Sequence, residues 1–420
     1  MSTRADVIVI GGGQAGLATS RELGLAGIDH LVLERDRIGA SWAGLWDNFR
    51  LNTPNWSVRL PGLPYGGPDP DAFASRAEMV AHLERYRAEM DAPVLEGVEV
   101  QALEPRGEGF ELSTSDGPMS ARSVVVCTGA YQRALSPPGT DGLPAHVTML
   151  DTRAYRNPAM VPDGDVLVVG SGQSGCQIAE DLVDAGRSVI LSCGRAPWVP
   201  RRIGDHDVFW WVLETGFMSE RVETLPTPAA RLAANLTASG VDGGHDLHPR
   251  ALQAKGVTLA GRFAGVEDGR LRFLDDLAES IEWGDARYRD FSRLAQRFCA
   301  ERGIEAPDLP EPAPFVEDPS PATDARSIGT IIFSGGFRPD YSWIHVAGGF
   351  DPMGFPAQVD GASTAVPGLF FVGVHFLRTR KSSLLCGVGE DAAIVAGAVT
   401  RHLATDETGA PGPNGPGPTT

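Results

Sequence analysis

The sequence predicts an α/β protein whose two halves are each built on a parallel β-sheet. A motif that occurs twice is the first reason: "DVIVIGGGQAG" at 6–16 and "DVLVVGSGQSG" at 165–175 both place G-x-G-x-x-G directly after four apolar β-formers. Each copy is followed by a stretch with helical spacing and then by a second apolar strand. The length is a third reason, because 420 residues exceed what one core can bury and indicate two or three domains.

The first unit, 5–36, reads as a buried strand, a glycine turn, an amphipathic helix and a second strand. Leu17, Leu23 and Leu25 supply the apolar face of the helix, and the second strand, "HLVLE", ends on Glu34. An acid at that point, about 20 residues after the turn, suits a ribose hydroxyl. The alternative is a glycine-rich turn in which Glu34 is an ordinary surface residue.

The glycines of the first turn have separate tasks in a Rossmann-like dinucleotide site. Gly11 permits the tight turn, Gly13 lets the backbone approach a pyrophosphate, and Gly16 allows the helix to pack closely on the strand. The phosphates then lie on the helix N-terminus, at Gln14 and Ala15, where free N–H groups and the helix dipole favour negative charge. The first unit is therefore predicted to bind a dinucleotide.

The second unit, 165–195, repeats the pattern without the acid. Its predicted phosphate-binding residues are Gly170, Gly172, Gln173, Ser174 and Gly175. Its second strand ends at Ser192 and Cys193, and Arg195 follows. A ribose 2′-phosphate is repelled by a carboxylate and attracted by an arginine, so this unit is predicted to bind NADPH rather than NADH.

Two further arginines follow the second unit and allow two interpretations. Arg201 and Arg202 either help Arg195 to bind the 2′-phosphate, or they pair with the nearby acids Asp205 and Asp207. A chain with two dinucleotide sites can hold one cofactor permanently while another visits. FAD in the first site and NADPH in the second would move hydride into a flavin.

The rest of the chain predicts further strands and helices around the two units. In chain order these are an antiparallel meander at 97–105, 110–115 and 121–129, a Pro- and Gly-rich connection at 131–144, helices at 207–218 and 281–303, a β-meander at 256–273, buried strands at 327–340 and 367–376, and a small-residue helix at 390–404.

We therefore predict two Rossmann-like dinucleotide-binding domains with a partly helical insertion. The FAD-binding domain is discontinuous and comprises 1–160 and 325–405, and the NADP-binding domain comprises 161–324. The insertion, at about 205–320, is the least Rossmann-like part and the expected source of substrate selectivity, although its aromatic helix is by composition more typical of a core. The tail, 406–420, is rich in Pro, Gly and Thr and is predicted to be disordered.

Composition limits the partners. A net charge of −18 argues against nucleic acid or an anionic membrane, since both would be repelled. No apolar run approaches the ~20 residues of a transmembrane helix. The five cysteines contain no C-x-x-C, so neither a zinc site nor a redox dithiol is signalled, and no metal is expected. We expect a cytoplasmic protein that acts on a small molecule, with a homodimer as a possible assembly.

Nearly the whole chain resembles a known family, the class B flavin-dependent monooxygenases. The resemblance rests on the two glycine motifs, on "GASWAGLWDNFRLNTP" at 39–54, on "VVVCTGA" at 124–130 and on "IIFSGGFRPDYSWI" at 331–344. The stretch "HFLRTRKSSLLCGVGEDAA" at 375–393 is similar to a bacterial subgroup commonly labelled as flavoproteins involved in potassium transport. Nothing in the sequence gives that transport label physical support.

The resemblance implies further site residues. Asn52 looks like the family's asparagine beside the reactive flavin carbon, where its amide would hold oxygen species and NADP⁺; the alternative is an Asn-Thr-Pro turn. The cofactor contacts that the resemblance adds are Arg35, Trp42, Thr128, Gly129 and Gly373. Phe376, Arg378 and Lys381 follow the strand expected to reach the flavin, and they could line the active site with positive charge.

The activity that the resemblance implies is oxygenation by dioxygen. An FAD-dependent, NADPH-reduced monooxygenase forms a C4a-(hydro)peroxyflavin, which would oxygenate a small molecule at nitrogen, at sulfur or at a ketone. The alternatives are an NADPH-dependent reductase or oxidase that passes electrons to oxygen or a quinone, a thioredoxin reductase-like disulfide oxidoreductase, and a non-catalytic flavin sensor.

Two departures from the family pattern affect this prediction. The family fingerprint places a histidine where "LPAHVTMLDTRAYRNP" has Asp151, with Tyr155 four residues later, and Gly335 stands in place of a threonine. An aspartate cannot donate as an imidazolium does, so the coupling of NADPH oxidation to oxygenation is in question. His146 is expected to be a loop residue rather than a substitute.

Overall fold

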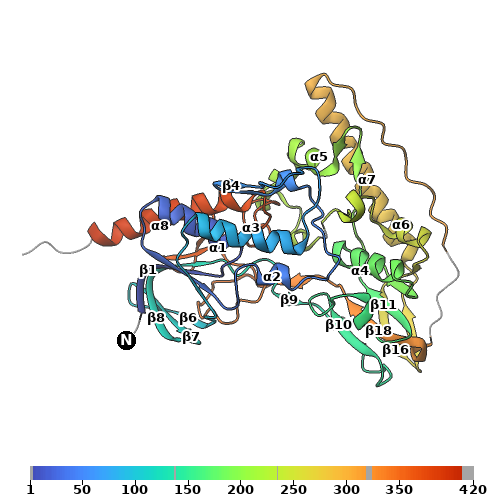
Figure 1. The fold of residues 1–420 in the computed structure, drawn as a ribbon, viewed down its shortest axis with the longest axis horizontal. Coiled ribbons are helices and arrows are strands. Elements are labelled where there is room, and N and C mark those ends of the chain that lie inside the picture. Colours follow the sequence, from blue (N-terminus) through green and yellow to red (C-terminus); the bar gives the residue numbers. More distant parts are fainter. Residues whose placement is uncertain (1–2, 137–138, 234, 318–323, 409–420) are drawn as a thin grey trace, which may run out of the picture.

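The computed structural model describes residues 3–136, 139–233, 235–317 and 324–408. They form two lobes, with the first sheet in the left lobe of Figure 1 and the second in the right lobe. The predicted α/β architecture with two parallel-stranded units is confirmed. Of the tail predicted to be disordered, 406–408 belong to the last helix, and the remainder lies outside the described residues.

The first sheet has nine strands and carries the first glycine unit. Its order is β20 (Gln358–Val359), β21 (Ala362–Ser363), β22 (Leu369–Phe371), β8 (Gly117–Val126), β1 (Thr3–Ile10), β2 (His30–Glu34) and β5 (Val94–Glu96), with β6 (Val100–Arg106) and β7 (Gly109–Thr114) attached through β8. The strands from β22 to β5 pair in parallel, and β6, β7 and β8 form the predicted antiparallel meander. Val7, Ile8 and Val9 of β1 are fully buried, as expected of a central parallel strand.

The second sheet has five parallel strands and carries the second glycine unit. Its order is β10 (Thr148–Asp151), β18 (Ile328–Phe333), β11 (Asp165–Val169), β12 (Val189–Ser192) and β15 (Thr258–Ala260). Two of these strands differ from the predicted boundaries, because the prediction places 148–151 and 328–333, which form β10 and β18, in the first domain. The change of sheet lies between β9 (Arg133–Ala134) and β10 and between β18 and β19 (Phe337–Arg338), rather than at residues 160 and 325.

Helices cover the sheets and form the insertion (Figure 1). They are α1 (Gln14–Leu25), α2 (Ala40–Ala43), α3 (Arg76–Glu89), α4 (Gln173–Asp184), α5 (Val208–Glu214), α6 (Pro249–Ala254), α7 (Leu277–Arg302) and α8 (Val388–Thr408). α1 packs beside α8, and Leu17 and Leu23 face the core of the first sheet. The prediction for Leu25 was wrong, since its side chain is 69% exposed.

The insertion has a core of its own. Phe209 and Trp211 of α5 pack against Phe291 and Phe298 of α7, and all four are nearly fully buried. The aromatic helix is thus core, as its composition favours. The meander predicted at 256–273 is only partly present, because β15 joins the second sheet and only β16 (Phe263–Glu267) and β17 (Arg270–Phe273) form a hairpin.

The chain crosses between the lobes at a pair of short strands. β9 (Arg133–Ala134) lies in the predicted connection and pairs with β19 (Phe337–Arg338), which leads back from β18. Two further short hairpins are β3 (Arg59–Leu60) with β4 (Leu63–Pro64) and β13 (Arg202–Ile203) with β14 (His206–Asp207). No helix within the described residues has the length and apolar character needed to span a bilayer.

Candidate functional site

The two glycine turns have nearly the same geometry. They follow β1 and β11 at the carboxyl ends of the two sheets, and Gly11 and Gly170 have φ angles of 105° and 111°, which favour glycine. A Cβ added to Gly16 would lie 1.8 Å from the carbonyl oxygen of Gly11, and one added to Gly175 would lie 1.8 Å from that of Gly170. The expected close packing of helix on strand is present in both units, and phosphate binding by the turns stays a prediction.

Both helices that follow these turns begin without a cap. α1 starts after Gly13 and α4 after Gly172, with no side-chain cap and no acid in the first turn. α3, by contrast, has a complete capping box formed by Ser75 and Glu78. A Cβ on Gly13 would meet nothing within 4 Å, so the backbone is open to a ligand there. Free amides and an open approach are what a pyrophosphate requires.

Glu34 ends β2 beside the first turn. Its Oε2 accepts a hydrogen bond from the amide of Gly12 at 2.7 Å, and its Oε1 accepts one from the amide of Asp36 at 2.9 Å. The carboxylate is thus fixed where the turn begins, and it is half-buried rather than an ordinary surface group. Arg35 points into solvent, with 71% of its side chain exposed, and its ion pair with Asp36 measures 3.4 Å.

Gln14 connects the start of α1 to two other segments. Its Oε1 accepts a hydrogen bond from the Trp42 indole nitrogen at 3.3 Å, and its Nε2 donates to the carbonyl of Ser383 at 3.3 Å. Behind it, a Cβ on Gly373 would lie 2.6 Å from the Cβ of Ala15, so the strand end approaches the helix as closely as glycine permits. The predicted residues Gln14, Ala15, Trp42 and Gly373 therefore lie together.

The segment that follows β22 carries buried polar atoms without a partner. Nδ1 of His375 and the hydroxyl of Ser383 are buried and make no hydrogen bond to the described residues. Burial lowers the pKa of His375 to about 4, so its ring is neutral near pH 7. The next residue, Phe376, is buried with φ of 51°, a strained conformation for a side chain of this size. Orphaned polar groups beside an uncapped glycine turn fit a polar cofactor such as FAD.

Asn52 lies on the loop that follows Trp42. It is half-buried, and its carbonyl oxygen accepts a hydrogen bond from Nη1 of Arg201 at 2.7 Å. Its side-chain amide makes no hydrogen bond to any residue that the structure describes. The main chain of Asn52 is therefore fixed while its amide is free.

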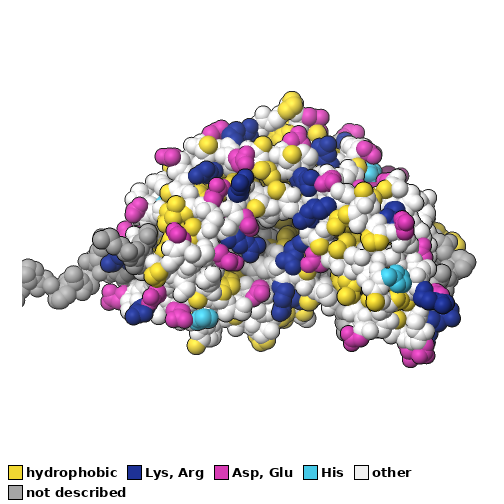
Figure 2. All heavy atoms as spheres, turned by 60° about the horizontal axis from the view of Figure 1, so that its bottom comes forward, with side chains coloured by type: hydrophobic (Ala, Val, Ile, Leu, Met, Phe, Trp, Pro, Cys, Tyr) yellow, Lys and Arg dark blue, Asp and Glu magenta, His cyan; other side chains and the backbone are white. Residues whose placement is uncertain are grey.

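Thr128 and Gly129 follow β8, the neighbour of β1. The Thr128 hydroxyl accepts a hydrogen bond from Nε2 of Gln132 at 2.8 Å, and Gly129 has φ of 85°. They lie at the same edge of the sheet as the first glycine turn, because β1 and β8 are parallel. Figure 2 shows a hollow near the middle of one face of the molecule, with Lys and Arg side chains on both sides of it among scattered acids.

The second unit is covered by the insertion. Gln173 exchanges two hydrogen bonds with Ala238: its Nε2 donates to the carbonyl at 2.8 Å, and its Oε1 accepts from the amide at 3.0 Å. Ser174 is half-buried in the first turn of α4. Ser192, where the first unit has its acid, donates to the carbonyl of Gly261 at 3.1 Å and accepts from the amide of Phe263 at 2.8 Å. A buried hydroxyl without charge replaces the carboxylate.

The arginines near the second unit differ sharply in exposure. Arg195 is 59% exposed and pairs with Glu279 at 2.5 Å, so it is free to exchange partners. Arg201 is buried and pairs with Asp207 at 2.5 Å, and Arg202 donates to the carbonyl of Asp205 at 3.0 Å. Of the two interpretations left open for Arg201, its pairing with Asp207 is present, and its guanidinium is enclosed.

Asp151 has a local structural role. Its Oδ1 accepts hydrogen bonds from the amides of Arg153 and Ala154 at 2.8 and 3.0 Å, which closes a turn after β10. Tyr155 points away from it and donates to Asp181 of α4 at 2.6 Å. The histidine position of the fingerprint is therefore occupied by a turn-forming carboxylate, while the aromatic position is part of the second core.

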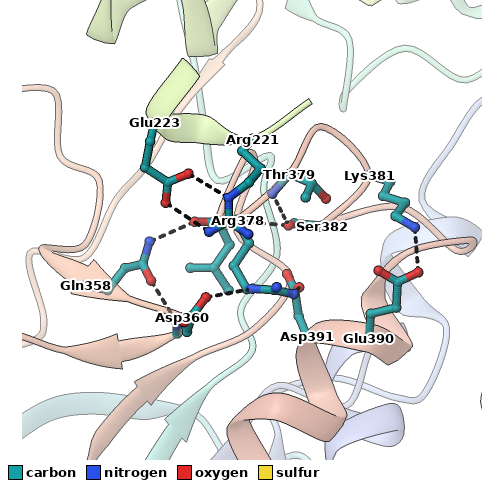
Figure 3. Close-up of polar contacts among 12 residues, drawn as sticks. Arg221, Glu223, Gln358, Asp360, Arg378, Thr379, Lys381, Ser382, Glu390 and Asp391 are labelled. Atoms are coloured by element: carbon teal, nitrogen blue, oxygen red, sulfur yellow. Dashed lines mark hydrogen bonds and ion pairs between the residues drawn. The ribbon is translucent and has the colours of Figure 1, made fainter. Parts of the chain in front are cut away.

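The positive lining predicted after β22 was wrong. Arg378 pairs with Asp360 at 2.9 Å and with Asp391 at 3.0 Å, and Lys381 pairs with Glu390 at 2.5 Å (Figure 3). Each cation is neutralised by a carboxylate, Asp360 in the turn between β20 and β21 or Glu390 and Asp391 of α8. Within the same segment, His375 and Ser383 carry the buried polar atoms that lack a partner among the described residues, and burial is the signal that distinguishes them.

The cysteines form no disulfide. All five are free, and four of them are buried. Burial raises the pKa of Cys127 to about 12 and that of Cys386 to about 11. A redox dithiol needs two cysteines that can close on each other and a readily formed thiolate. The arrangement does not support dithiol chemistry in this chain.

Comparison with known proteins agrees with this architecture. Residues 8–213 match the family model described as pyridine nucleotide-disulphide oxidoreductase. An uncharacterized oxidoreductase, CzcO-like, from Geobacillus kaustophilus is 29% identical over 399 residues, which cover 94% of this chain and 99% of that one. A flavin-containing monooxygenase from Stenotrophomonas maltophilia has a TM-score of 0.68 at 21% identity, covering 96% of this chain and 99% of that one.

A bacillithiol disulfide reductase from Staphylococcus aureus also shares the fold. Its TM-score is 0.62 at 13% identity, and the match covers 96% of this chain and 99% of that one. The fold is therefore common to oxygenating and disulfide-reducing enzymes, and it does not decide between them. The chain therefore has the α/β two-dinucleotide-binding-domain flavoprotein fold, and its residues 8–213 match the pyridine nucleotide-disulphide oxidoreductase family.

Proposed function

We propose that the chain is an FAD-dependent monooxygenase that is reduced by NADPH and transfers one oxygen atom from dioxygen to a small molecule. The observation that carries the proposal is the state of Asn52. Its carbonyl oxygen accepts a hydrogen bond from Nη1 of Arg201 at 2.7 Å, while its side-chain amide makes no hydrogen bond to the described residues. A fixed, neutral donor between the two units is suited to hold an oxygen species or NADP⁺.

The first unit would hold FAD. The uncapped amides of α1 would bind the pyrophosphate, and Glu34 would accept from the ribose hydroxyls. Trp42 and Gln14 would border the cofactor, and His375 would offer a neutral ring nitrogen to its polar edge. When bound, FAD supplies the redox chemistry, accepting hydride and activating dioxygen.

The second unit would hold NADPH. The amides of α4 would bind its pyrophosphate, and Arg195 would exchange Glu279 for the 2′-phosphate. The insertion would exclude water from the cleft between the units, because its segment at 238 is bonded to Gln173. We propose that the substrate binds beside Asn52 and is oxygenated at a nucleophilic nitrogen, at a nucleophilic sulfur or at a ketone.

Rapid mixing tests this proposal. The enzyme is loaded with FAD, reduced with NADPH and mixed with oxygenated buffer while absorbance is recorded. We expect a transient band, distinct from oxidised and reduced flavin, that outlives a second, and ¹⁸O from labelled dioxygen in the product of an amine or sulfide probe. Asn52→Ala should shorten the transient, whereas Asn48→Ala, an exposed asparagine in the same segment, should leave it unchanged.

A reductase or oxidase is the second candidate, and Asp151 is the observation that favours it. The fingerprint position is a turn-forming carboxylate and has no imidazole to position NADP⁺. On this reading the flavin returns directly to its oxidised state, one peroxide is released for each NADPH, and no probe acquires ¹⁸O. That result would replace the monooxygenase proposal.

A further inference from the structure

Arg201 is a buried cation that belongs to the second lobe and contacts the first. It lies between β12 and β13, and only 2% of its surface is exposed. Its Nη1 donates to the carbonyl of Asn52, 149 residues earlier in the chain, at 2.7 Å. Its guanidinium also lies over the ring of Phe73, 4.3 Å from the centroid, in the first lobe. The residue therefore joins the Asn52 loop to the second dinucleotide unit.

The second lobe holds Arg201 by its side chain and its backbone. Nε donates to Oδ2 of Asp207 at 2.8 Å, and the backbone amide donates to Oδ1 of Asp246 at 2.6 Å. Asp207 is itself fixed, because its Oδ1 caps α5 by accepting from the amide of Phe209 at 2.7 Å. The planar guanidinium is suited to this place, since its donors can reach a carboxylate on one side and a carbonyl on the other.

A short segment beside Arg201 completes the connection. Gly240 packs so closely on the Asn52 loop that a Cβ would lie 1.9 Å from the carbonyl oxygen of Leu51. The same segment begins at Ala238, which exchanges two hydrogen bonds with Gln173 at the start of α4. A continuous set of contacts therefore runs from the start of α4 to the Asn52 loop.

We propose that Arg201 is a positioning residue that sets the Asn52 loop against the second dinucleotide unit. It fixes the main chain of Asn52 and leaves the amide free for the ligand. The inference rests on the proposed function, in which that amide contacts an oxygen species or NADP⁺. A lysine could not replace Arg201, because a single ammonium cannot span both Asp207 and the Asn52 carbonyl with the same geometry.

The test uses full-length enzyme loaded with FAD and variants that separate positioning from stability. Arg201→Met leaves Asp207 buried without its cation, which destabilises the fold. The double variant R201M/D207N removes that charge and keeps an amide that can cap α5. R201K retains the charge, and Arg59→Met, at an exposed arginine in the segment that follows Asn52, is the matched control.

Two readouts are recorded for each variant. One is the lifetime of the transient band after mixing with oxygen, and the other is the change in the visible circular dichroism of oxidised FAD when NADP⁺ is added. We expect R201M/D207N and R201K to shorten the lifetime roughly tenfold, an effect of ~1.4 kcal/mol, and to reduce the NADP⁺-induced change. Arg59→Met should match the wild type, and thermal unfolding should show R201M/D207N restored toward wild-type stability.

A double-mutant cycle that combines R201M/D207N with Asn52→Ala decides whether Arg201 acts through Asn52. If it does, adding R201M/D207N to Asn52→Ala shortens the lifetime no further. Independent, additive effects would overturn the proposal, as would a wild-type lifetime and NADP⁺ response in R201M/D207N. If the wild type forms no transient, the monooxygenase proposal fails, and the circular dichroism still shows whether Arg201 sets the loop.

Discussion

The two glycine units share a turn and differ in what surrounds it. In both turns, a Cβ added to the last glycine would lie 1.8 Å from the carbonyl oxygen of the first glycine. Both helices start without a cap. The second strand of the first unit ends on Glu34, whose Oε2 accepts a hydrogen bond from the Gly12 amide of the turn at 2.7 Å. The second strand of the second unit ends on the uncharged Ser192. The comparison teaches that the two turns are alike in geometry and that the units differ in charge at the strand end, which in the proposal selects the ribose that each unit accepts.

The units also differ in their covering segments. The first turn is bordered by the chain that follows β22, through the bond from Gln14 to the Ser383 carbonyl. The second is bordered by the insertion, through Gln173 and Ala238, and that insertion also contacts the Asn52 loop. The first turn is thus bordered from within its own lobe, and the second is bordered by a segment that contacts both lobes. In the proposal, this arrangement suits a resident cofactor in the first unit and a visiting one in the second.

The largest expected effect comes from adding one methyl group to either turn. Gly16→Ala and Gly175→Ala each drive a Cβ into a backbone carbonyl that cannot move aside. We expect Gly16→Ala to lose FAD, and Gly175→Ala to retain FAD while its affinity for NADPH falls by roughly 100-fold or more, ~2.7 kcal/mol. Flavin absorbance and NADPH titration measure the two losses.

Matched controls make this result specific. A Cβ at Gly24 of α1 or at Gly194 after β12 meets nothing within 4 Å, so alanine at these positions should bind both cofactors normally. Loss of FAD in Gly175→Ala, or of NADPH alone in Gly16→Ala, would reverse the assignment of the two units.

The next largest effect concerns the choice between NADPH and NADH. Arg195 is exposed and can leave Glu279 for a 2′-phosphate, which is absent from NADH. Arg195→Ala should weaken the binding of NADPH by ~2 kcal/mol, roughly 30-fold, and leave the binding of NADH nearly unchanged. Steady-state KM values for both nucleotides give the ratio. Equal losses for the two nucleotides would contradict the assignment of the 2′-phosphate to Arg195.

Local chemistry explains why the turns were predictable from the sequence. Gly16 packs on Gly11, five residues earlier, and Glu34 bonds Gly12, 22 residues earlier in the same unit, so the motif and its spacing contain the information. Asn52 is predicted as a site residue only from the resemblance to a known family. The geometry of its free amide is visible only in the fold. The role of Arg201 could not be predicted, because its partner lies 149 residues away and an arginine after a NADP-type strand is equally typical of a phosphate ligand.

The predicted boundaries failed for a related reason. A fully buried parallel strand is apolar whichever sheet it joins, so the sequence of β18 does not say that it pairs with β11 rather than with β1. Likewise Arg378 and Lys381 look like a positive lining until Asp360, Asp391 and Glu390 are placed beside them. Long-range pairing decides both cases, and periodicity does not report it.

A smaller effect should follow from changing Glu34 alone. Its carboxylate binds the amide of Gly12 in the turn and, in the proposal, the ribose of FAD. Glu34→Gln keeps the size and removes the charge, and we expect FAD to bind roughly tenfold more weakly, ~1.4 kcal/mol. Titration of the apoenzyme with FAD measures this. Ser192→Ala is the counterpart in the second unit, and it should leave FAD affinity unchanged.

The smallest effect concerns the segment of the insertion that covers the second unit. His245 lies on this segment and bonds Glu180 of α4 through Nε2 at 2.7 Å. That hydrogen bond raises the pKa of His245 above its ordinary value of about 6.5. Because the folded pKa is the higher one, the stability that protonated His245 contributes is complete below about pH 6.5 and is lost as pH rises through the raised pKa.

The contribution is expected to be about 1 kcal/mol, since the pair is partly exposed. His245→Gln can still donate to Glu180 but cannot titrate, so its unfolding midpoint should fall less than that of the wild type between pH 6 and pH 8. The exposed His146→Gln should keep the wild-type slope. Denaturant midpoints at several pH values measure the difference. If His245→Gln and the wild type show the same slope, the segment over α4 is held by Gln173 and Ala238, and its closure does not depend on protonation.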